Sequence, residues 1–216
     1  MINILGNQNS ILNQFIYQLR DIDIQKDSMR FRRNLERIGE IFAYEISKRL
    51  EYEKTEVTTA LGVAEINILK SQVVLGTILR AGLPLHAGML NVFDAAENAF
   101  VSAYRKHHKN GKFDIQVEYV SSPDLNGKVL MLSDPMLATG LSVVLTYKQL
   151  LSYGKPAHTH IVAVLASHEG VEYLKKQLPE SSFTLWLGAV DDELTAQSYI
   201  VPGLGDAGDL AFGCKV

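Results

Sequence analysis

The chain has 216 residues, of which 47% are hydrophobic and 21% are charged, and its formal net charge is −3. This length suits one large α/β domain over residues 1–216, because no internal repeat or low-complexity linker divides the chain. The acidic balance argues against a nucleic-acid partner, whose phosphates need a basic surface, and no apolar run is long enough to cross a membrane.

Two features of the chain suggest its compartment. The N-terminal stretch MINILGNQNS lacks the basic segment and the cleavage site of a secretory signal. The single cysteine, Cys214, cannot form an internal disulfide and has no activating partner near it in sequence. We therefore expect a cytoplasmic protein and assign Cys214 no role.

The first regular element that we expect is a long amphipathic helix over residues 30–50. Its apolar residues recur three or four positions apart, which is the spacing of one helix face. They are Phe31, Leu35, Ile38, Phe42, Ile46 and Leu50. Arg30, Arg32 and Arg33 stand at its start, and we interpret them as a solvent-exposed face of this helix.

Short apolar runs punctuated by glycine or proline follow, and they indicate buried strands. These runs cover residues 73–79, 100–104, 129–132, 160–165 and 183–187. Helix-length segments at 141–153 and 170–178 lie between some of them. The alternation of strand and helix predicts an α/β fold with a mostly parallel twisted sheet flanked by helices.

One segment departs from this alternation. Between residues 113 and 119 apolar and polar side chains alternate, which is typical of a half-exposed antiparallel strand, and Asn110-Gly111 is a hairpin-turn signal. We therefore predict a hairpin arm at about residues 100–120. Its apolar face must be covered by the chain's own core or by another subunit, so we expect a homodimer or a higher homo-oligomer.

The stretch VLMLSDPMLATGLSVVLTYKQLL, residues 129–151, carries the most chemical information. A strand delivers Asp134 at its C-terminal end, and a loop of small and hydroxyl-bearing residues leads into a helix. Backbone amides at 138–142, with the Thr139 and Ser142 hydroxyls, suit a phosphate group, while a carboxylate one turn away suits sugar hydroxyls. The pair fits a ribose 5-phosphate. A plain strand–loop–helix with Thr139 or Ser142 as the helix cap is the alternative.

The C-terminal stretch YIVPGLGDAGD, residues 199–209, is dense in glycine. Gly203, Gly205 and Gly208 match the spacing of a dinucleotide-binding fingerprint. That fingerprint needs a helix, a second strand and an acidic residue about 20 positions later. The eight residues after Gly208 leave no room for these features, so we expect the rigid turn to serve another purpose.

Three stretches resemble uracil phosphoribosyltransferases, in the order of that family. DPMLATGLS, residues 134–142, is similar to the family's phosphoribosyl pyrophosphate signature, ILRAG at 78–82 to its pyrophosphate loop, and YIVPGLGDAGD to its uracil-binding loop. The likeness covers about residues 29–212. It implies a type I phosphoribosyltransferase fold with a C-terminal base-binding hood at about 199–212. It also implies a pentosyltransferase of pyrimidine salvage that converts uracil and 5-phosphoribosyl 1-pyrophosphate to UMP and pyrophosphate.

The resemblance assigns roles to individual residues. Arg80 and Arg105 match arginines that bind the pyrophosphate, Asp134 matches the residue that holds the ribose hydroxyls, and these three are the implied catalytic residues. Mg²⁺ is the implied cofactor, held mainly through substrate oxygens rather than by protein ligands. The residues implied to bind phosphoribosyl pyrophosphate are Arg80, Arg105, Asp134, Pro135, Met136, Leu137, Ala138, Thr139, Gly140, Leu141, Ser142 and Asp206. Those implied to contact uracil are Ile200, Gly205, Asp206 and Ala207.

The chain departs from the family pattern in three places. The phosphate loop ends in Gly140-Leu141-Ser142 where the family has two glycines before the serine, so either Leu141 is already helical or the loop is altered. Basic residues at 106–109 replace acidic ones, and we interpret them as a solvated hairpin tip. Leu210 stands where the family has a basic residue. These departures leave open a catalytically weakened, nucleotide-binding regulatory paralogue that retains the phosphoribosyl site.

Other candidate sites fit the sequence less well. Ser167, His168 and Glu169 are neighbours in sequence, which is not how a catalytic triad is usually built. His158 and His160 can share a strand face, but no third ligand with metal-binding spacing is near them. We therefore interpret the two histidines as a satisfied or exposed pair.

Overall fold

The structure is a computed structural model of the whole chain. It describes the backbone of residues 1–107 and 113–214 and the side chains of residues 1–102 and 118–214. The predicted turn at Asn110-Gly111 lies outside the described residues.

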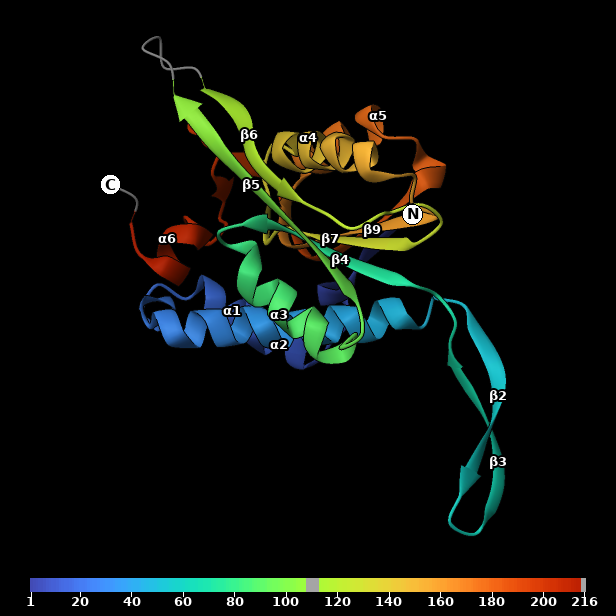
Figure 1. Cartoon of the computed structure of the whole chain (residues 1–216). Coiled ribbons are helices and arrows are strands. Elements are labelled where there is room, and N and C mark those ends of the chain that lie inside the picture. Colours follow the sequence, from blue (N-terminus) through green and yellow to red (C-terminus); the bar gives the residue numbers. More distant parts are fainter. Residues whose placement is uncertain (108–112, 215–216) are drawn as a thin grey trace.

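A twisted, mostly parallel sheet forms the centre of the molecule (Figure 1). Among the described residues its strand order is β1-β10-β9-β7-β4-β5-β6, and β8 pairs with β9. Every pairing in this sheet is parallel except that of β5 with β6. The strands are β1 (Ile2–Ile4), β4 (Val73–Leu79), β5 (Glu97–His107), β6 (Phe113–Ser121), β7 (Val129–Ser133), β8 (Met136–Leu137), β9 (His158–Ser167) and β10 (Phe183–Asp191).

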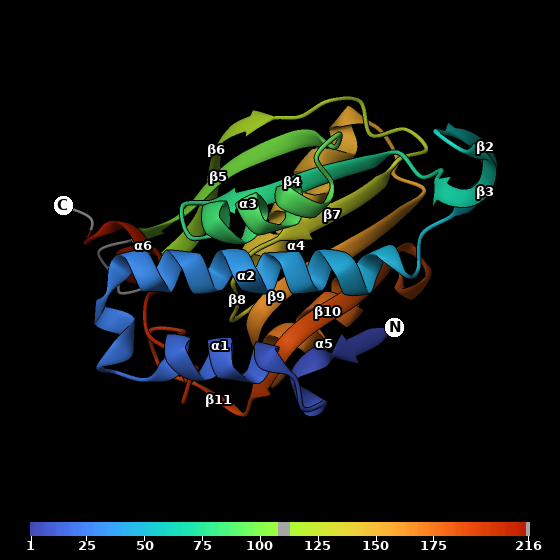
Figure 2. The ribbon, with the colours of Figure 1, turned by 90° about the horizontal axis from the view of Figure 1, so that it is seen from below.

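Helices cover both faces of the sheet, and a buried apolar cluster lies on each side (Figures 1 and 2). One face carries α1 (Ile11–Arg20), α2 (Ser28–Ser47) and α3 (Gly82–Val92), and the other carries α4 (Leu141–Leu150) and α5 (His168–Gln177). Short 3-10 turns lie in the connections at Leu5–Asn7, Ile24–Lys26, Leu151–Tyr153 and Glu180–Ser182. None of the helices in the described part of the chain has the length and apolar character of a membrane span.

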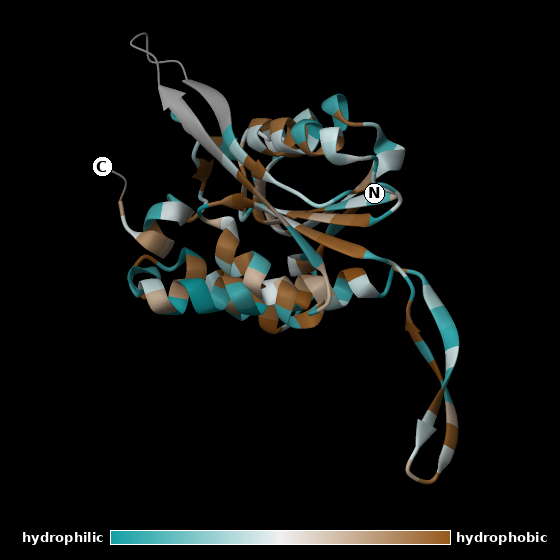
Figure 3. Cartoon of the chain, in the orientation of Figure 1, coloured by the Kyte–Doolittle hydropathy of each residue, from teal (hydrophilic) through white to brown (hydrophobic). Residues whose placement is uncertain are grey.

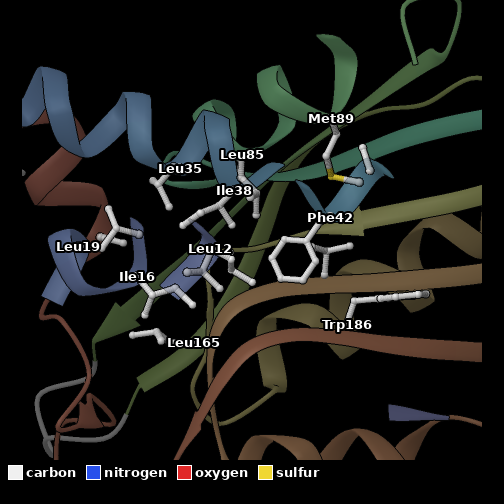
Figure 4. Packing of buried hydrophobic residues seen from close by; sticks show 14 of the residues in the cluster. Leu12, Ile16, Leu19, Leu35, Ile38, Phe42, Leu85, Met89, Leu165 and Trp186 are labelled. Carbon is white, nitrogen blue, oxygen red and sulfur yellow. The ribbon is translucent and has the colours of Figure 1, made fainter. Parts of the chain in front are cut away.

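Helix α2 shows how the sequence pattern becomes packing. Asp27 caps its N-terminus by accepting a hydrogen bond from a backbone amide three residues later, at 3.0 Å. Leu35, Ile38 and Phe42 point from α2 into the core (Figure 4), and all three are fully buried. The predicted helix over 30–50 is therefore confirmed, shifted by two or three residues toward the N-terminus.

Two glycines let α2 and α3 approach each other closely. A side-chain carbon on Gly39 would collide with the Leu85 carbonyl oxygen, and one on Gly88 would collide with the Glu36 carbonyl oxygen. A larger residue at either crossing would push the helices apart. Because α3 begins two residues after Arg80, this packing fixes the loop that carries Arg80.

The five predicted strands are all present, with ends that differ by a few residues. The predicted arm is the antiparallel β5–β6 hairpin, whose pairing runs from Phe100 opposite Ser121 toward its tip. The sequence pattern did not predict β1, α1, α3 or a second antiparallel hairpin, β2 (Tyr52–Thr59) with β3 (Gly62–Leu69). This second hairpin projects away from the body of the molecule and carries both hydrophilic and hydrophobic residues (Figures 1 and 3).

The two histidines of β9 lie side by side, with ring centroids 4.9 Å apart. The Trp186 indole donates a hydrogen bond to His160 Nδ1 at 3.0 Å, and His158 Nε2 lies 2.9 Å from the Thr184 hydroxyl. The interpretation as a satisfied pair is therefore confirmed. Burial is the main cause that lowers the pKa of His160, the charge of His158 adds to it, and together they bring the pKa to about 4.

His160 should make the stability of the fold depend on pH. Its pKa is about 4 in the folded protein against 6.5 ordinarily, so between these values the unfolded chain binds the proton more readily. Stability is fully present above about pH 6.5 and is lost as the pH falls toward 4, by roughly 3 kcal/mol at most. We expect urea unfolding at about pH 5 and about pH 7 to show this loss.

The matched variant is His160→Gln, which keeps a hydrogen-bond acceptor for Trp186 but does not titrate. It should show a smaller loss of stability at low pH than the natural sequence. An unchanged pH dependence in this variant would assign the loss to other groups, such as His86, whose pKa is also lowered by burial.

Candidate active site

The candidate site lies at one edge of the sheet, where the parallel strands β4, β7 and β10 have their carboxyl ends. Arg80 follows β4, Asp134 follows β7, and the glycine-rich turn comes after β10. β4 and β7 are adjacent, with Thr77 opposite Ser133, and the Thr77 hydroxyl donates to the Ser133 carbonyl oxygen at 3.4 Å. Loops at this edge are where open α/β sheets bind their ligands.

The loop after β7 leads from Asp134 to the first turn of α4. The Asp134 carboxylate accepts a hydrogen bond from the Met136 amide at 3.2 Å, and the Pro135 carbonyl oxygen accepts bonds from two β9 amides at 3.0 Å. Most of the loop residues singled out by the sequence surround one small pocket. Its lining consists of Asp134, Met136, Leu137, Ala138, Thr139, Gly140, Ser142 and Val143.

Gly140 makes the turn from this loop into α4. Its φ is +78°, in the left-handed region that favours glycine, and α4 begins at the next residue, Leu141. A side-chain carbon at Gly140 would also lie 2.9 Å from the Gly170 carbonyl oxygen. Of the two alternatives for Leu141, the structure shows the first: Leu141 is helical, and the positive φ falls on Gly140.

The start of α4 is not closed by a side-chain cap. The N-cap residue is Gly140, which makes no side-chain cap bond, and the Thr139 hydroxyl accepts only a long bond, at 3.4 Å, from the Leu141 amide. The first-turn amides of a helix have no partners inside the helix, and the helix dipole makes this end positive. The pocket therefore borders a helix end that suits an anion.

Ser167 holds this loop from the side of α5. Its hydroxyl donates to the Ala138 carbonyl oxygen at 2.6 Å and accepts from the Gly170 amide at 2.9 Å. Ser167 is therefore the cap of α5, and both bonds of its hydroxyl serve structure rather than nucleophilic attack.

The Arg80 side chain lies against a short C-terminal helix, α6 (Ala207–Phe212). Its Nη2 is 3.0 Å from Asp209 Oδ1, and its Nη1 donates to the Gly213 carbonyl oxygen at 3.3 Å. Its Nε is buried and has no hydrogen-bond partner among the described residues. Two of the three guanidinium nitrogens are thus bound to the end of the chain.

Helix α6 corrects the prediction that the end of the chain leaves no room for a helix. The helix has six residues, and Asp206 caps it by accepting a hydrogen bond from the Asp209 amide at 3.0 Å. Residues 213–214 add no strand after it. The dinucleotide fingerprint therefore still lacks its second strand in the described residues.

The glycine-rich turn is fixed by a largely buried ion pair. Arg20 Nη1 and Nη2 each lie 2.7 Å from one carboxylate oxygen of Asp191. Both partners also bind Gly203, whose amide donates to Asp191 and whose carbonyl oxygen accepts from Arg20, each at 3.0 Å. The shape of the turn is thus set by side chains from α1 and β10.

The four positions implied to contact uracil lie along this turn. Ile200 is buried in β12 (Ile200–Val201), which pairs with β11 (Glu193–Leu194), and Gly205, Asp206 and Ala207 lead into α6. Gly205 has a φ of +96°, and the space beside its α-carbon is open to at least 4 Å. Its main chain is therefore accessible to a flat ligand.

Arg32 requires a second correction. Its guanidinium donates to the Ala211 carbonyl oxygen at 2.6 Å and lies 5.9 Å from the centre of the Phe212 ring, so it supports α6 rather than facing solvent alone. Arg30 and Arg33 are exposed as expected, each paired with an acidic residue three positions away.

Sequence reasoning missed Arg20, Asp191 and Asp209. Arg20 and Asp191 are 171 positions apart, so no local spacing joins them. The one available signal was that Asp191, like Asp134, ends an apolar strand. Arg105 lies on β5, but its side chain is outside the described side chains, so its contact with pyrophosphate stays a prediction.

The fold and the site together define a type I phosphoribosyltransferase. A mostly parallel sheet carries Asp134 and a pocket-forming loop at the end of one of its inner strands, and a glycine-rich turn follows another strand of the sheet. A hypoxanthine phosphoribosyltransferase from Staphylococcus aureus has the same fold, with a TM-score of 0.50 at 14% identity over 87% of this chain and 84% of that one.

Comparison with known proteins identifies the family. The model of the uracil phosphoribosyltransferase family matches residues 7–214. A uracil phosphoribosyltransferase of Porphyromonas gingivalis is 54% identical over 98% of each chain. The solved structure of the AQ2163 protein from Aquifex aeolicus has a TM-score of 0.88 at 29% identity and covers 100% of both chains. The chain belongs to the uracil phosphoribosyltransferase family.

The chain is accordingly a glycosyltransferase of pyrimidine salvage, which converts uracil and 5-phosphoribosyl 1-pyrophosphate to UMP and pyrophosphate. Nothing in the comparisons favours the regulatory paralogue considered above. Leu141, one of the departures that suggested it, is accommodated because Gly140 takes the positive φ.

Breaking the Arg20–Asp191 pair should disturb the glycine-rich turn, to which the family resemblance assigns uracil binding. Arg20→Ala leaves a buried carboxylate without its cation, so we expect the free energy of unfolding to fall by about 2 kcal/mol. The KM for uracil should rise more than that for phosphoribosyl pyrophosphate. Arg33→Ala, which removes an exposed arginine, is the control and should change stability by less than about 0.5 kcal/mol. Equal changes in both KM values would contradict a specific role for the pair in the base turn.

Proposed function

We propose that residues 134–142 bind the ribose 5-phosphate part of phosphoribosyl pyrophosphate and that the turn from Ile200 to Ala207 binds uracil. The observation that carries the proposal is the pocket that joins the Asp134 carboxylate to the uncapped start of α4. Loop amides at a helix N-terminus suit the phosphate, and Thr139 and Ser142 add hydroxyl groups. The carboxylate at the other side of the pocket suits the ribose hydroxyls.

The reaction sets what the surrounding groups must do. The bond from the anomeric carbon to pyrophosphate breaks, and a ring nitrogen of uracil forms a new bond at the opposite face of the sugar while its proton is lost to solvent. Positive charge develops on the ribose and negative charge on the leaving group, so fixed cations near the pyrophosphate lower the barrier. Arg80 and Arg105 are the proposed cations, and Arg80 follows the strand beside that of Asp134.

Mg²⁺ is the proposed cofactor, and when bound it supplies positive charge to the oxygens of the pyrophosphate. The described side chains contain no group of three potential metal ligands. Asp134 fits as an oxygen donor, because it is one of the residues that line the pocket and hard cations take oxygen ligands. Substrate oxygens would complete the coordination.

The assembly and location of the protein are part of the proposal. We expect one domain over residues 1–216 that forms a homo-oligomer in the cytoplasm, with small-molecule substrates rather than nucleic acid. The β5–β6 arm is the proposed contact, and the β2–β3 hairpin supports an assembled state as well. A two-stranded hairpin is marginal in water on its own, and this one exposes Val57, Leu61, Val63, Ile66 and Ile68.

Asp134→Asn should lower kcat far more than stability, because it removes charge from a loop and no volume from the core. We expect a decrease of at least about a hundredfold in pyrophosphate release, measured with Mg²⁺ and both substrates, and little change in the melting temperature. Asp23→Asn is the matched control, since Asp23 is an exposed carboxylate paired only with Lys26 in the described residues. Unchanged kinetics in Asp134→Asn would remove this residue from the site.

The base turn should distinguish uracil from cytosine. Uracil offers an N3–H donor and an O4 acceptor, whereas cytosine offers the inverse pair, and fixed backbone groups cannot exchange donor for acceptor. We expect kcat/KM to favour uracil by at least about a thousandfold, because cytosine leaves buried polar groups unpaired. Initial rates with the two bases test this, and Ile200→Val should barely alter the ratio. Similar efficiencies would show that the turn does not read the base.

A further inference from the structure

One ion pair connects the loop after β4 with the C-terminal helix. Arg80 Nη2 lies 3.0 Å from Asp209 Oδ1. The Arg80 side chain is 37% exposed and the Asp209 side chain is 34% exposed. A side-chain carbon on Gly208 would lie 3.4 Å from the same Nη2, so the backbone of α6 packs directly on the guanidinium. Arg80 and α6 therefore occupy positions that depend on each other.

The remaining nitrogen of this guanidinium is unusual. Arg80 Nε is buried and has no hydrogen-bond partner among the described residues. A buried donor without an acceptor is costly, and a charged donor more so. An anionic oxygen would remove that cost by drawing the side chain until Nε is uncovered, while Asp209 and the Gly213 carbonyl oxygen keep the other two nitrogens occupied.

We infer that Asp209 is a positioning residue: it holds the Arg80 guanidinium so that Nε is the nitrogen left for the pyrophosphate, and it thereby couples the pyrophosphate site to the turn proposed to bind uracil. The inference builds on the proposed role of Arg80 as a pyrophosphate-binding residue. Asp209 itself touches neither substrate in this arrangement. Its effect on the reaction passes through Arg80.

The coupling follows from the first turn of α6. The Asp209 amide donates to the Asp206 carboxylate at 3.0 Å, and the Asp209 carboxylate pairs with Arg80. Asp209 therefore connects Asp206, the cap of α6, with the arginine of the loop after β4. An anion that draws the guanidinium into place fixes Asp209, and Asp209 fixes the start of α6, where Ala207 stands. Coupling of this kind is reciprocal, so uracil must favour pyrophosphate binding by the same factor.

Asp209→Asn tests the inference, because it removes the charge but retains the size of the side chain and the amide that bonds to Asp206. We expect the KM for phosphoribosyl pyrophosphate to rise by about fivefold or more, with a smaller change in kcat. The KM for uracil should also become less dependent on the concentration of phosphoribosyl pyrophosphate. Asp209→Glu should restore part of the loss, since it returns the carboxylate.

The matched control is Asp192→Asn, which removes a carboxylate that is 89% exposed and faces His168 rather than Arg80. It should leave both KM values unchanged. Thermal unfolding of each variant separates positioning from folding: a purely structural role of Asp209 would lower the melting temperature without the selective change in KM, and that result would overturn the inference.

A double-mutant cycle with Arg80→Ala distinguishes the inference from the proposed function. If Asp209 acts through Arg80, then Asp209→Asn has no further effect on KM in the Arg80→Ala background. Additive effects, or an Asp209→Asn variant with unchanged kinetics beside an impaired Arg80→Ala, would overturn the role of Asp209 alone. An Arg80→Ala variant with an unchanged KM for phosphoribosyl pyrophosphate would overturn the proposed role of Arg80 and the inference with it.

Discussion

The glycine-rich turn that we propose binds uracil, here called the base turn (residues 200–207), depends on one ion pair, Arg20 with Asp191. A glycine-rich backbone loses much conformational entropy when it is ordered, so it keeps a single shape only through contacts from outside the turn. Asp191 is 7% exposed, and a carboxylate so deeply buried is stable only beside a cation and hydrogen-bond donors. Arg20 supplies the cation and the Gly203 amide supplies a donor. Any relaxation of the turn would therefore take the Gly203 amide away from a buried carboxylate and the Gly203 carbonyl oxygen away from Arg20.

The two halves of the site have different kinds of support. The phosphate loop is held by the sheet, because Pro135 bonds to β9 and Ala138 bonds to Ser167 at its end. The base turn extends beyond the sheet and is held by side chains from α1 and β10 and by the helix that Arg80 contacts. Transfer requires the sugar carbon and the base nitrogen to be aligned. A fixed phosphate pocket therefore aligns the two reacting atoms only if these distant side chains also fix the turn.

Sequence patterns predicted the parts of the molecule in which structure is local. The loop that we propose binds phosphate could be located because its strand, loop and helix are contiguous in residues 129–151. Arg32 could not be placed, since the basic residues near it, Arg30 and Arg33, are exposed while its partner, Ala211, is 179 positions away. The β2–β3 hairpin was missed because its strands are exposed and lack the buried apolar runs by which the other strands were recognised. The fold brings distant segments into contact, and the spacing of residues within one segment does not predict these contacts.

Helix α6 shows how such distant contacts build the base site. Its six residues are far fewer than an isolated helix needs to be stable in water. Asp206 caps its start, and Arg32 and Arg80 each bind a carbonyl oxygen at its C-terminal end, where positive charge also favours the helix dipole. Leu210, which replaces a basic residue of the family pattern, instead packs against the core. The cations that stabilise this helix thus come from α2 and from the loop after β4, so the order of the base site depends on side chains outside the glycine-rich stretch itself.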